Sequence, residues 1–238
     1  MPDKVSAIIV AAGKGERMGS SGVPKQFIEL AGVPMLGWSV SALSSSDIID
    51  EIVIVSSEEW MERAVKTADE YCRHSSCRPA IGGRTRQQSV YNGLKSASGP
   101  DVVLIHDAAR PFVSTELAER TIEAARQEGA ATASLKPADT IKLWDEGSAS
   151  GRNLPRERLR TIQTPQAFRA VLLQQAHERA IEEDYQATDD TDLLERTGQR
   201  TIMVEGSAYN LKITDAADLE LARAMVWAGL VPSPVKGR

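Results

Sequence analysis

The stretch of sequence that decides the fold lies near the amino end, where residues 5–26 read VSAIIVAAGKGERMGSSGVPKQ. The segment 5–10 is apolar apart from Ser6 and predicts a buried strand. Small residues and glycines follow from Ala11 to Gly19, and where a Cβ is missing the backbone N–H groups can approach a phosphate closely. A strand that leads into such a loop is typical of the ligand-binding edge of an open α/β sheet.

Strand and helix patterns alternate along the rest of the chain. This alternation predicts an α/β fold with a doubly wound, mostly parallel, Rossmann-like sheet. A short helix is expected after the capping residues 188–190, and an extended run over 209–213. Further strands are expected at 52–55, 102–105, 131–135 and 201–205, and helices at 34–43, 58–71, 86–97, 115–127, 169–183 and 215–228.

The alternation breaks between residues 139 and 163. Two strand-like runs, 140–144 and 159–162, flank a segment rich in glycine and serine that can supply a turn. We interpret residues 138–163 as a hairpin arm that protrudes from a single domain spanning 1–238. Because a lone hairpin is only marginally stable, the arm would gain by packing on a partner chain, and we expect a homodimer.

Composition excludes several classes of function. The 28 basic and 33 acidic residues give a formal net charge of −5, which disfavours non-specific nucleic-acid binding. Apolar runs are only a few residues long, far short of the ~20 that span a membrane. The amino end shows no secretory leader, so a cytoplasmic enzyme is expected.

The cysteines Cys72 and Cys77 are too few for a disulfide framework, which favours a reducing compartment. With His74 between them they could be read as zinc ligands. That interpretation is disfavoured because the spacing is C-x4-C and the sequence offers no fourth ligand nearby. A polar loop that carries two thiols is expected instead.

Three cations, Lys14, Arg17 and Lys25, fall in the glycine loop with only Glu16 to oppose them, so the acidic chain carries a local positive patch suited to a polyphosphate. The loop fails as a dinucleotide fingerprint because Met18 stands where the third glycine is required, and it also fails as a Walker A loop. A glycine-rich turn with solvated charges remains the alternative for the loop taken alone.

The loop 11–18 followed by Pro24, Lys25 and Gln26 resembles the nucleotidyltransferase loop of sugar-nucleotide pyrophosphorylases. Over nearly its full length the chain resembles the 2-C-methyl-D-erythritol 4-phosphate cytidylyltransferases, CTP-using enzymes of the non-mevalonate isoprenoid pathway. Several motifs in the right order are more specific than any one of them. The others lie at residues 24–27, 82–90, 106–112, 164–166, 188–190 and 210–214.

The resemblance implies that an oxygen of methylerythritol phosphate attacks the α-phosphorus of CTP and expels pyrophosphate. Arg17 and Lys25 match the family's two transition-state cations, a guanidinium fork and a compact ammonium. In the resembling enzymes Thr140 and Arg156 enter the partner's site. The other matched acceptor-positioning residues are Asp107, Arg110, Thr164, Thr188 and Lys212, and the matched nucleotide-binding residues are Ala11, Ala12, Gly13, Gly15, Gly83, Ser89 and Ala108.

For some of these residues a purely structural role remains an alternative. Asp107 and Arg110 could form a pair that fixes a turn, Thr188 or Asp189 could serve as a helix N-cap, and Lys212 could be an exposed cation in a strand. Arg84 stands where some relatives carry an acid, so a carboxylate contact to the nucleotide is not transferable at this position.

Magnesium is expected as the ion that accompanies CTP, bound mainly through the phosphates, and no cluster of acids nominates protein ligands for it. The nearest rival function is cytidylyl transfer to another polyol phosphate such as ribitol 5-phosphate, a group that tends to carry Ser-Val at the position of Ala108 and Ala109. A catalytically silent nucleotide-binding module and an NAD oxidoreductase are two further rivals.

Overall fold

A seven-stranded sheet lies at the centre of the molecule. The computed structural model describes residues 3–13, 23–144, 147 and 150–234. Within these ranges the strand order is β11-β7-β10-β6-β1-β4-β5. The strands are β1 (Val5–Val10), β4 (Glu51–Ser56), β5 (Ser76–Ile81), β6 (Val102–Asp107), β7 (Ala130–Leu135), β10 (Thr161–Arg169) and β11 (Ile202–Glu205).

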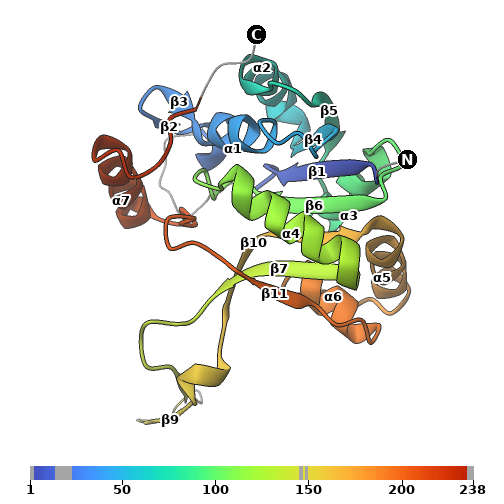
Figure 1. Ribbon diagram of the computed structural model, residues 1–238, viewed down its shortest axis with the longest axis vertical. Coiled ribbons are helices and arrows are strands. Elements are labelled where there is room, and N and C mark those ends of the chain that lie inside the picture. The colour runs from blue at the N-terminus through green and yellow to red at the C-terminus, as the bar shows by residue number, and fades with distance from the viewer. Residues whose placement is uncertain (1–2, 14–22, 145–146, 148–149, 235–238) are drawn as a thin grey trace.

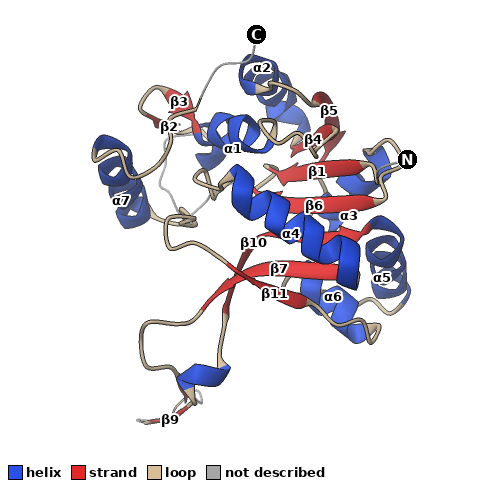
Figure 2. Cartoon of the chain, in the orientation of Figure 1, coloured by secondary structure: helices blue, strands red, loops and turns tan. Residues whose placement is uncertain are grey.

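The sheet is mostly parallel, as the sequence predicts. β1 pairs in parallel with β4 and with β6, β4 with β5, and β7 with β11. Among the strands of the described sheet, β10 alone runs the other way and pairs antiparallel with both β6 and β7. Figure 2 shows these strands side by side with helices on both faces.

Helices cover the sheet in two layers because alternate strand residues point to opposite faces. Ile9, Ile54 and Leu104 belong to the core cluster under one layer, and Ile8 and Val55 to the cluster under the other. The first layer consists of α1 (Met35–Leu43), α2 (Met61–Tyr71) and α4 (Thr115–Glu128), and the second of α3 (Arg86–Ser96), α5 (Ala170–Glu182) and α6 (Asp190–Arg196), as seen in Figure 1.

A third apolar cluster forms beside the sheet. The helix α7 (Ala216–Trp227) begins with a capping box between Asp215 and Asp218. It packs near the two-stranded ladder of β2 (Glu29–Leu30) and β3 (Val33–Pro34), which the sequence pattern does not predict. The buried side chains of this cluster include Leu30, Trp38, Phe112, Ile213 and Met225.

The predicted arm is present, but its pairing differs from the prediction. β8 (Lys142–Trp144) pairs with β9 (Gly151–Asn153), not with 159–162, at the tip of a segment that projects from the sheet in Figure 1. Thr161 already belongs to β10. The central strand β10 escaped notice because it carries the polar run Gln163, Thr164, Gln166 and contains a proline, which a register shift between Ile162 and Gln166 accommodates.

Two other expectations were wrong. Cys77 lies not in a polar loop but in β5, an edge strand whose mostly exposed residues and Pro79 hide the strand pattern. Residues 209–213 form no strand. Their chain instead turns and the Ile213 N–H donates to the Ala109 carbonyl at 2.8 Å. Both thiols are free, as expected.

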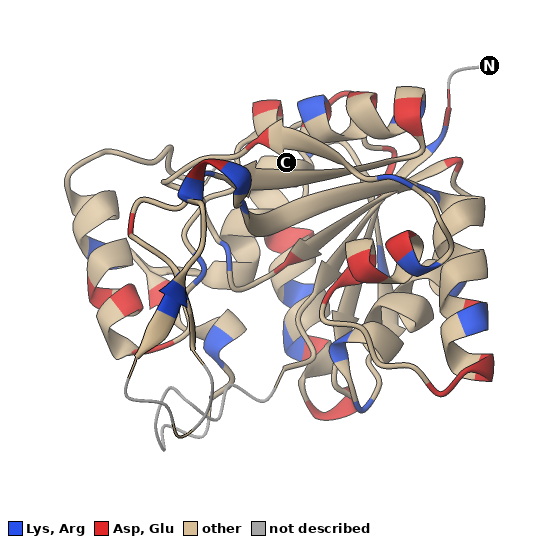
Figure 3. Ribbon diagram, turned by 90° about the horizontal axis from the view of Figure 1, so that it is seen from below, with Lys and Arg blue, Asp and Glu red and all other residues tan. Residues whose placement is uncertain are grey.

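No helix in the described ranges is long and apolar enough to cross a membrane. Acidic and basic residues are interspersed along the outer helices, as the colours in Figure 3 show. The net negative charge of the chain is therefore spread over its surface rather than gathered in one described element.

Glu51, at the start of β4, is a buried carboxylate that links several strands. It accepts hydrogen bonds from the Ser6 hydroxyl (2.9 Å), Arg78 Nε (2.9 Å), and the Ser98 N–H (2.9 Å) and hydroxyl (2.7 Å). Burial works against ionisation, but these hydrogen bonds outweigh it and lower the pKa of Glu51 from 4.5 to about 2.

Glu51→Gln is expected to lower the free energy of unfolding at pH 7 by roughly 3–4 kcal/mol, since one pKa unit corresponds to about 1.4 kcal/mol. Because the folded-state pKa is depressed, this contribution is complete above the unfolded value of 4.5 and is lost as the pH falls toward about 2. Denaturant unfolding at pH 7 and pH 3 checks this, with the exposed Glu59→Gln as control. An equal deficit at both pH values would contradict it.

Candidate active site

A cavity of about 970 Å3 opens at the carboxyl ends of β1 and β6. In an open α/β sheet this is the edge at which ligands bind. Its described walls come from the ends of these strands, from the η2 turn (Lys25–Phe27), from residues 82–92 and from the segment around Lys212. The cavity brings together the predicted residues Ala11, Ala12, Gly13, Lys25, Gly83, Ser89, Asp107, Ala108 and Lys212.

Two glycines allow one wall of this cavity to form. A Cβ on Gly82 would collide with the Cβ of Ala12, and one on Gly83 would collide with the side chain of Gln88. The Gly83 N–H donates to the Ser89 hydroxyl at 3.0 Å, which in turn donates to the carbonyl of the α3 N-cap, Thr85, at 2.8 Å. The wall is thus preorganised by its own hydrogen bonds.

Lys25 lies in the η2 turn, where its Nζ donates to the Ile213 carbonyl at 3.1 Å. The next residue, Gln26, is buried, and its Nε2 donates to the carbonyls of Ala11 (2.5 Å) and Gly13 (3.3 Å). Gln26 therefore anchors the start of the glycine loop, a role that sequence reasoning missed. Lys14, Gly15 and Arg17 lie outside the described residues.

Asp107, the last residue of β6, sits between two cations. Its Oδ1 is 3.0 Å from Arg86 Nε and its Oδ2 is 2.8 Å from Lys212 Nζ. Burial alone would raise the pKa of Asp107, but the two cations outweigh it and hold the pKa well below its usual value. Lys212 is therefore not a solitary cation in a strand, and Asp107 forms its ion pairs with residues other than Arg110.

Arg110 is buried away from this cavity. Its backbone N–H donates to the Asp107 carbonyl (2.9 Å), and its Nη1 donates to the Asn210 carbonyl (2.8 Å). Burial lowers the pKa of Arg110 below its usual value, although the neighbouring Asp107 charge opposes this. Arg110 is not among the cavity's lining residues, so as placed it holds the 210 segment against the end of β6.

Thr164 contacts the backbone of Asp107 and helps to fix the position of this residue. Its hydroxyl accepts from the Asp107 N–H (3.1 Å) and lies 3.2 Å from His106 Nδ1, while His106 Nε2 is 2.9 Å from the Arg110 carbonyl. Burial lowers the pKa of His106 to about 4, so the ring is neutral at pH 7. A carbonyl can only accept, so Nε2 donates and Nδ1 accepts from Thr164.

The remaining predicted residues lie apart from this cavity. Thr188 lines a second cavity of about 710 Å3, together with residues 157–160 of the arm, which precede β10. Its N–H donates to Asp192 (3.0 Å), while Asp189 is the N-cap of α6, so the capping interpretation holds for Asp189. Thr140 and Arg156 lie on the arm, where Arg156 Nη1 donates to the Ala138 carbonyl at 2.6 Å.

The cavity suits an anion. Its described lining includes four cations, Lys25, Arg84, Arg86 and Lys212, and one carboxylate, Asp107. The described residues contain no group of three or more metal-ligating side chains, and both oxygens of Asp107 are already paired with cations. The described residues therefore do not form a protein site for magnesium.

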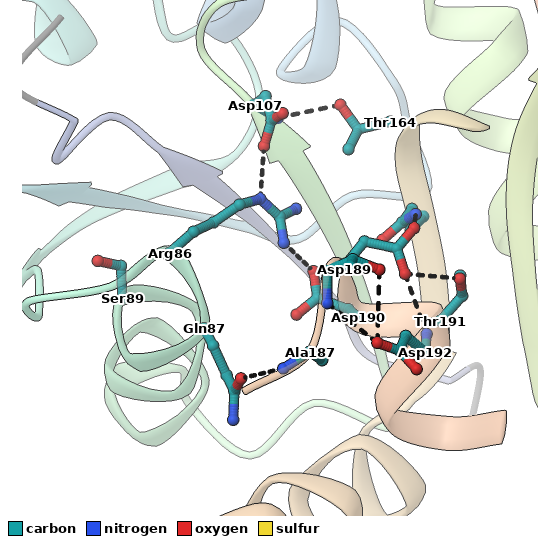
Figure 4. Close-up of polar contacts among 12 residues, drawn as sticks. Arg86, Gln87, Ser89, Asp107, Thr164, Ala187, Asp189, Asp190, Thr191 and Asp192 are labelled. Carbon is teal, nitrogen blue, oxygen red and sulfur yellow. Dashed lines mark hydrogen bonds and ion pairs between the residues drawn. The ribbon is translucent and has the colours of Figure 1, made fainter. Parts of the chain in front are cut away.

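Arg86 is the main residue that sequence reasoning missed. It begins α3 and reaches from Asp107 to Asp190, whose Oδ2 is 2.7 Å from Arg86 Nη1, as Figure 4 shows. One signal was present in the sequence. A cation in the first turn of a helix opposes the helix dipole, which indicates that some other charge holds it there.

Known proteins resemble this chain over most of its length. The model of the 2-C-methyl-D-erythritol 4-phosphate cytidylyltransferase family matches residues 5–228. A protein of that name from Clostridium botulinum (strain Langeland) is 42% identical over 94% of this chain and 97% of its own, and one from Thermotoga neapolitana is 42% identical over 91% and 94%.

Solved structures agree with the sequence matches. The 4-diphosphocytidyl-2C-methyl-D-erythritol synthase of Anaerococcus prevotii superposes with a TM-score of 0.83 at 31% identity, covering 94% of this chain and 99% of its own. The cytidylyltransferase of Thermus thermophilus superposes with a TM-score of 0.76 at 37% identity over the same shares. The chain therefore belongs to the 2-C-methyl-D-erythritol 4-phosphate cytidylyltransferase family.

Proposed function

We propose that this protein transfers a cytidylyl group from CTP to 2-C-methyl-D-erythritol 4-phosphate, releasing pyrophosphate and supplying isoprenoid precursor synthesis. The observation that carries the proposal is the cation-lined cavity at the carboxyl ends of β1 and β6, in a chain that belongs to this family. The glycine-built wall at residues 82–83 suits the base and ribose, and the cations suit the phosphates.

The chemistry asks the protein for position and charge rather than for a covalent intermediate. An oxygen of the acceptor phosphate forms a bond to the α-phosphorus of CTP while the bond from that phosphorus to the pyrophosphate oxygen breaks. Negative charge crowds the reacting centre, and cations fixed in advance stabilise it. Lys25 serves the nucleotide side and Lys212 the acceptor side, with Arg17 as the second transition-state cation.

Three further features belong to the proposal. The single domain acts as a homodimer in which each arm supplies Thr140 and Arg156 to the partner's site, as the exposed tip residues Leu143 and Trp144 support. The enzyme works in the cytoplasm, as its two free thiols support. Magnesium arrives with CTP, held by the phosphates and water.

The acceptor can be tested directly. Protein, CTP and Mg²⁺ are incubated with methylerythritol phosphate or with ribitol 5-phosphate, and pyrophosphate release is followed. Release with the first acceptor and little with the second is expected. No release with methylerythritol phosphate would overturn the proposal, and preference for ribitol phosphate would favour the other cytidylyltransferase.

Mixing Lys25→Ala and Arg156→Ala protomers is expected to restore activity that neither variant shows alone. If each arm serves the partner's site, a mixed dimer carries one site with both residues intact, so random exchange yields about a quarter of wild-type activity. Pyrophosphate release after subunit exchange measures this, with each variant mixed with itself as control. An arm that serves its own subunit predicts no recovery, because every site then lacks one residue.

A further inference from the structure

We propose that Arg86 is a positioning residue that links the nucleotide cavity to the acceptor side of the site, so that Asp107 and the amino end of α6 are held at a fixed separation. This inference rests on the proposed function and extends it to a residue that lies within the 82–90 motif but is not among the site residues matched to the family. Arg86 lies at the start of α3, in the cavity wall that includes Gly83 and Ser89. A cation is unusual in the first turn of a helix because it opposes the helix dipole.

The guanidinium bridges two carboxylates on two different elements. Nε is 3.0 Å from Asp107 at the end of β6, and Nη1 is 2.7 Å from Asp190 at the start of α6. Figure 4 shows the Arg86 side chain extended between them. A planar guanidinium can hold two acceptors in a defined geometry, whereas an ammonium is a point charge without such a fork.

Burial makes this bridge significant. The Asp190 side chain is 1% exposed and that of Asp107 is 11% exposed, while Arg86 retains 29%. Behind Asp190, the buried His177 Nε2 lies 3.7 Å from its second oxygen, and burial lowers the pKa of this ring. Because His177 therefore favours its neutral form, Arg86 is the main cation that compensates Asp190.

The bridge also connects the two cavities. Arg86 lines the first, while Thr188 and Asp189, immediately before Asp190, line the second. The adjacent Gln87 supports the same connection, since its Oε1 accepts from the Ala187 N–H (2.9 Å) and its Nε2 donates to the Tyr185 carbonyl (3.1 Å). Residues 86 and 87 thus tie the nucleotide wall to the segment that leads into α6.

Asp107 is the group through which Arg86 affects the acceptor. Among the described residues, the charged or titratable groups near this carboxylate besides Arg86 are Lys212 from the 209–214 segment, His106 in β6 and Arg110 after it. Without Arg86, one of the two paired cations is lost and the pKa of Asp107 rises. The acid limb of kcat/KM should then move to higher pH, because the ionised form is lost earlier as the pH falls.

The test compares Arg86→Ala, Arg86→Lys and a control, Arg179→Ala, which removes an exposed arginine that also pairs with a carboxylate at 2.7 Å. Since misplacement of a site by about 1 Å can cost about 10²-fold, kcat for Arg86→Ala should fall about 10–100-fold, with little change in KM for CTP. Arg86→Lys should restore the acid limb but only part of kcat. Arg179→Ala should match the wild type.

A second readout does not depend on turnover. Hydrogen exchange at the backbone amides of residues 187–192 should be faster in Arg86→Ala than in the wild type. Asp190→Asn replaces the carboxylate with an amide of nearly identical shape, and it should also speed this exchange and lower kcat. Unchanged kcat and acid limb in Arg86→Ala would overturn the inference, as would a loss confined to KM for CTP, which indicates direct nucleotide contact. A wild type that releases no pyrophosphate defeats the proposed function, while the exchange result still decides the bridge.

Discussion

Lys25→Ala is expected to lower kcat for cytidylyl transfer by about 10²–10³-fold, the loss typical of removing one preorganised donor to a developing negative charge. Lys25 lines the nucleotide cavity, and its Nζ lies 3.1 Å from the Ile213 carbonyl, so the ammonium is already oriented in the absence of substrate. Its effect should fall on kcat because the charge it meets is greatest in the transition state.

Pyrophosphate release at saturating CTP and methylerythritol phosphate measures this loss. Lys66→Ala provides the matched control, since Lys66 is an exposed lysine on α2 and is not among the cavity's lining residues. Thermal unfolding should be close to that of the wild type for both variants, because neither side chain belongs to the core clusters. A fall of less than about tenfold would count against the role of Lys25.

Lys212→Ala is expected to lower kcat/KM for methylerythritol phosphate by about 10²-fold, since a charge-assisted contact to the acceptor phosphate is lost. Its Nζ is held 2.8 Å from Asp107 Oδ2, which fixes the ammonium at the end of β6. The Lys212 side chain is 42% exposed, so solvent screens its charge, and Arg86 still compensates Asp107 in the variant, which should therefore fold.

The comparison between substrates makes this prediction specific. KM for CTP should change little in Lys212→Ala, and Lys212→Arg should recover part of the loss because the charge returns with different geometry. Initial rates are measured while one substrate is varied and the other is held at saturation. The two series separate the effect on CTP from the effect on the acceptor. An equal loss in kcat/KM for CTP and for the acceptor would place Lys212 on the nucleotide instead.

Much of the fold could be predicted from the sequence because its strands are short apolar runs buried on both faces. β1 and β6 are of this kind, and Asp107 lies at the end of β6 in the wall of the cavity. β5 and β10 escaped because their signals are weak for physical reasons. β5 is an exposed edge strand, and β10 carries polar residues that are buried by hydrogen bonding, such as Gln166 to Thr132 at 3.2 Å.

The candidate site was predictable only in part, for a related reason. Loop residues such as Gly83 and Lys25 carry local motifs, and motifs can be read without the fold. Arg86 acts through Asp107 and Asp190, which lie 21 and 104 residues away along the chain. A pairing of that kind depends on the packing of α3 against α5 and on the start of α6, which one sequence does not reveal.

The reversed strand β10 has a consequence for how this enzyme can change. Leu135 at the end of β7 pairs with Thr161 at the start of β10, so the intervening residues leave and rejoin the sheet at neighbouring strands about 4.8 Å apart. Such a gap can be closed by a turn of about two to five residues. The arm is therefore an insertion between adjacent strands, and its length and tip can change without rethreading the sheet, provided that Thr140 and Arg156 keep their places in the proposed site.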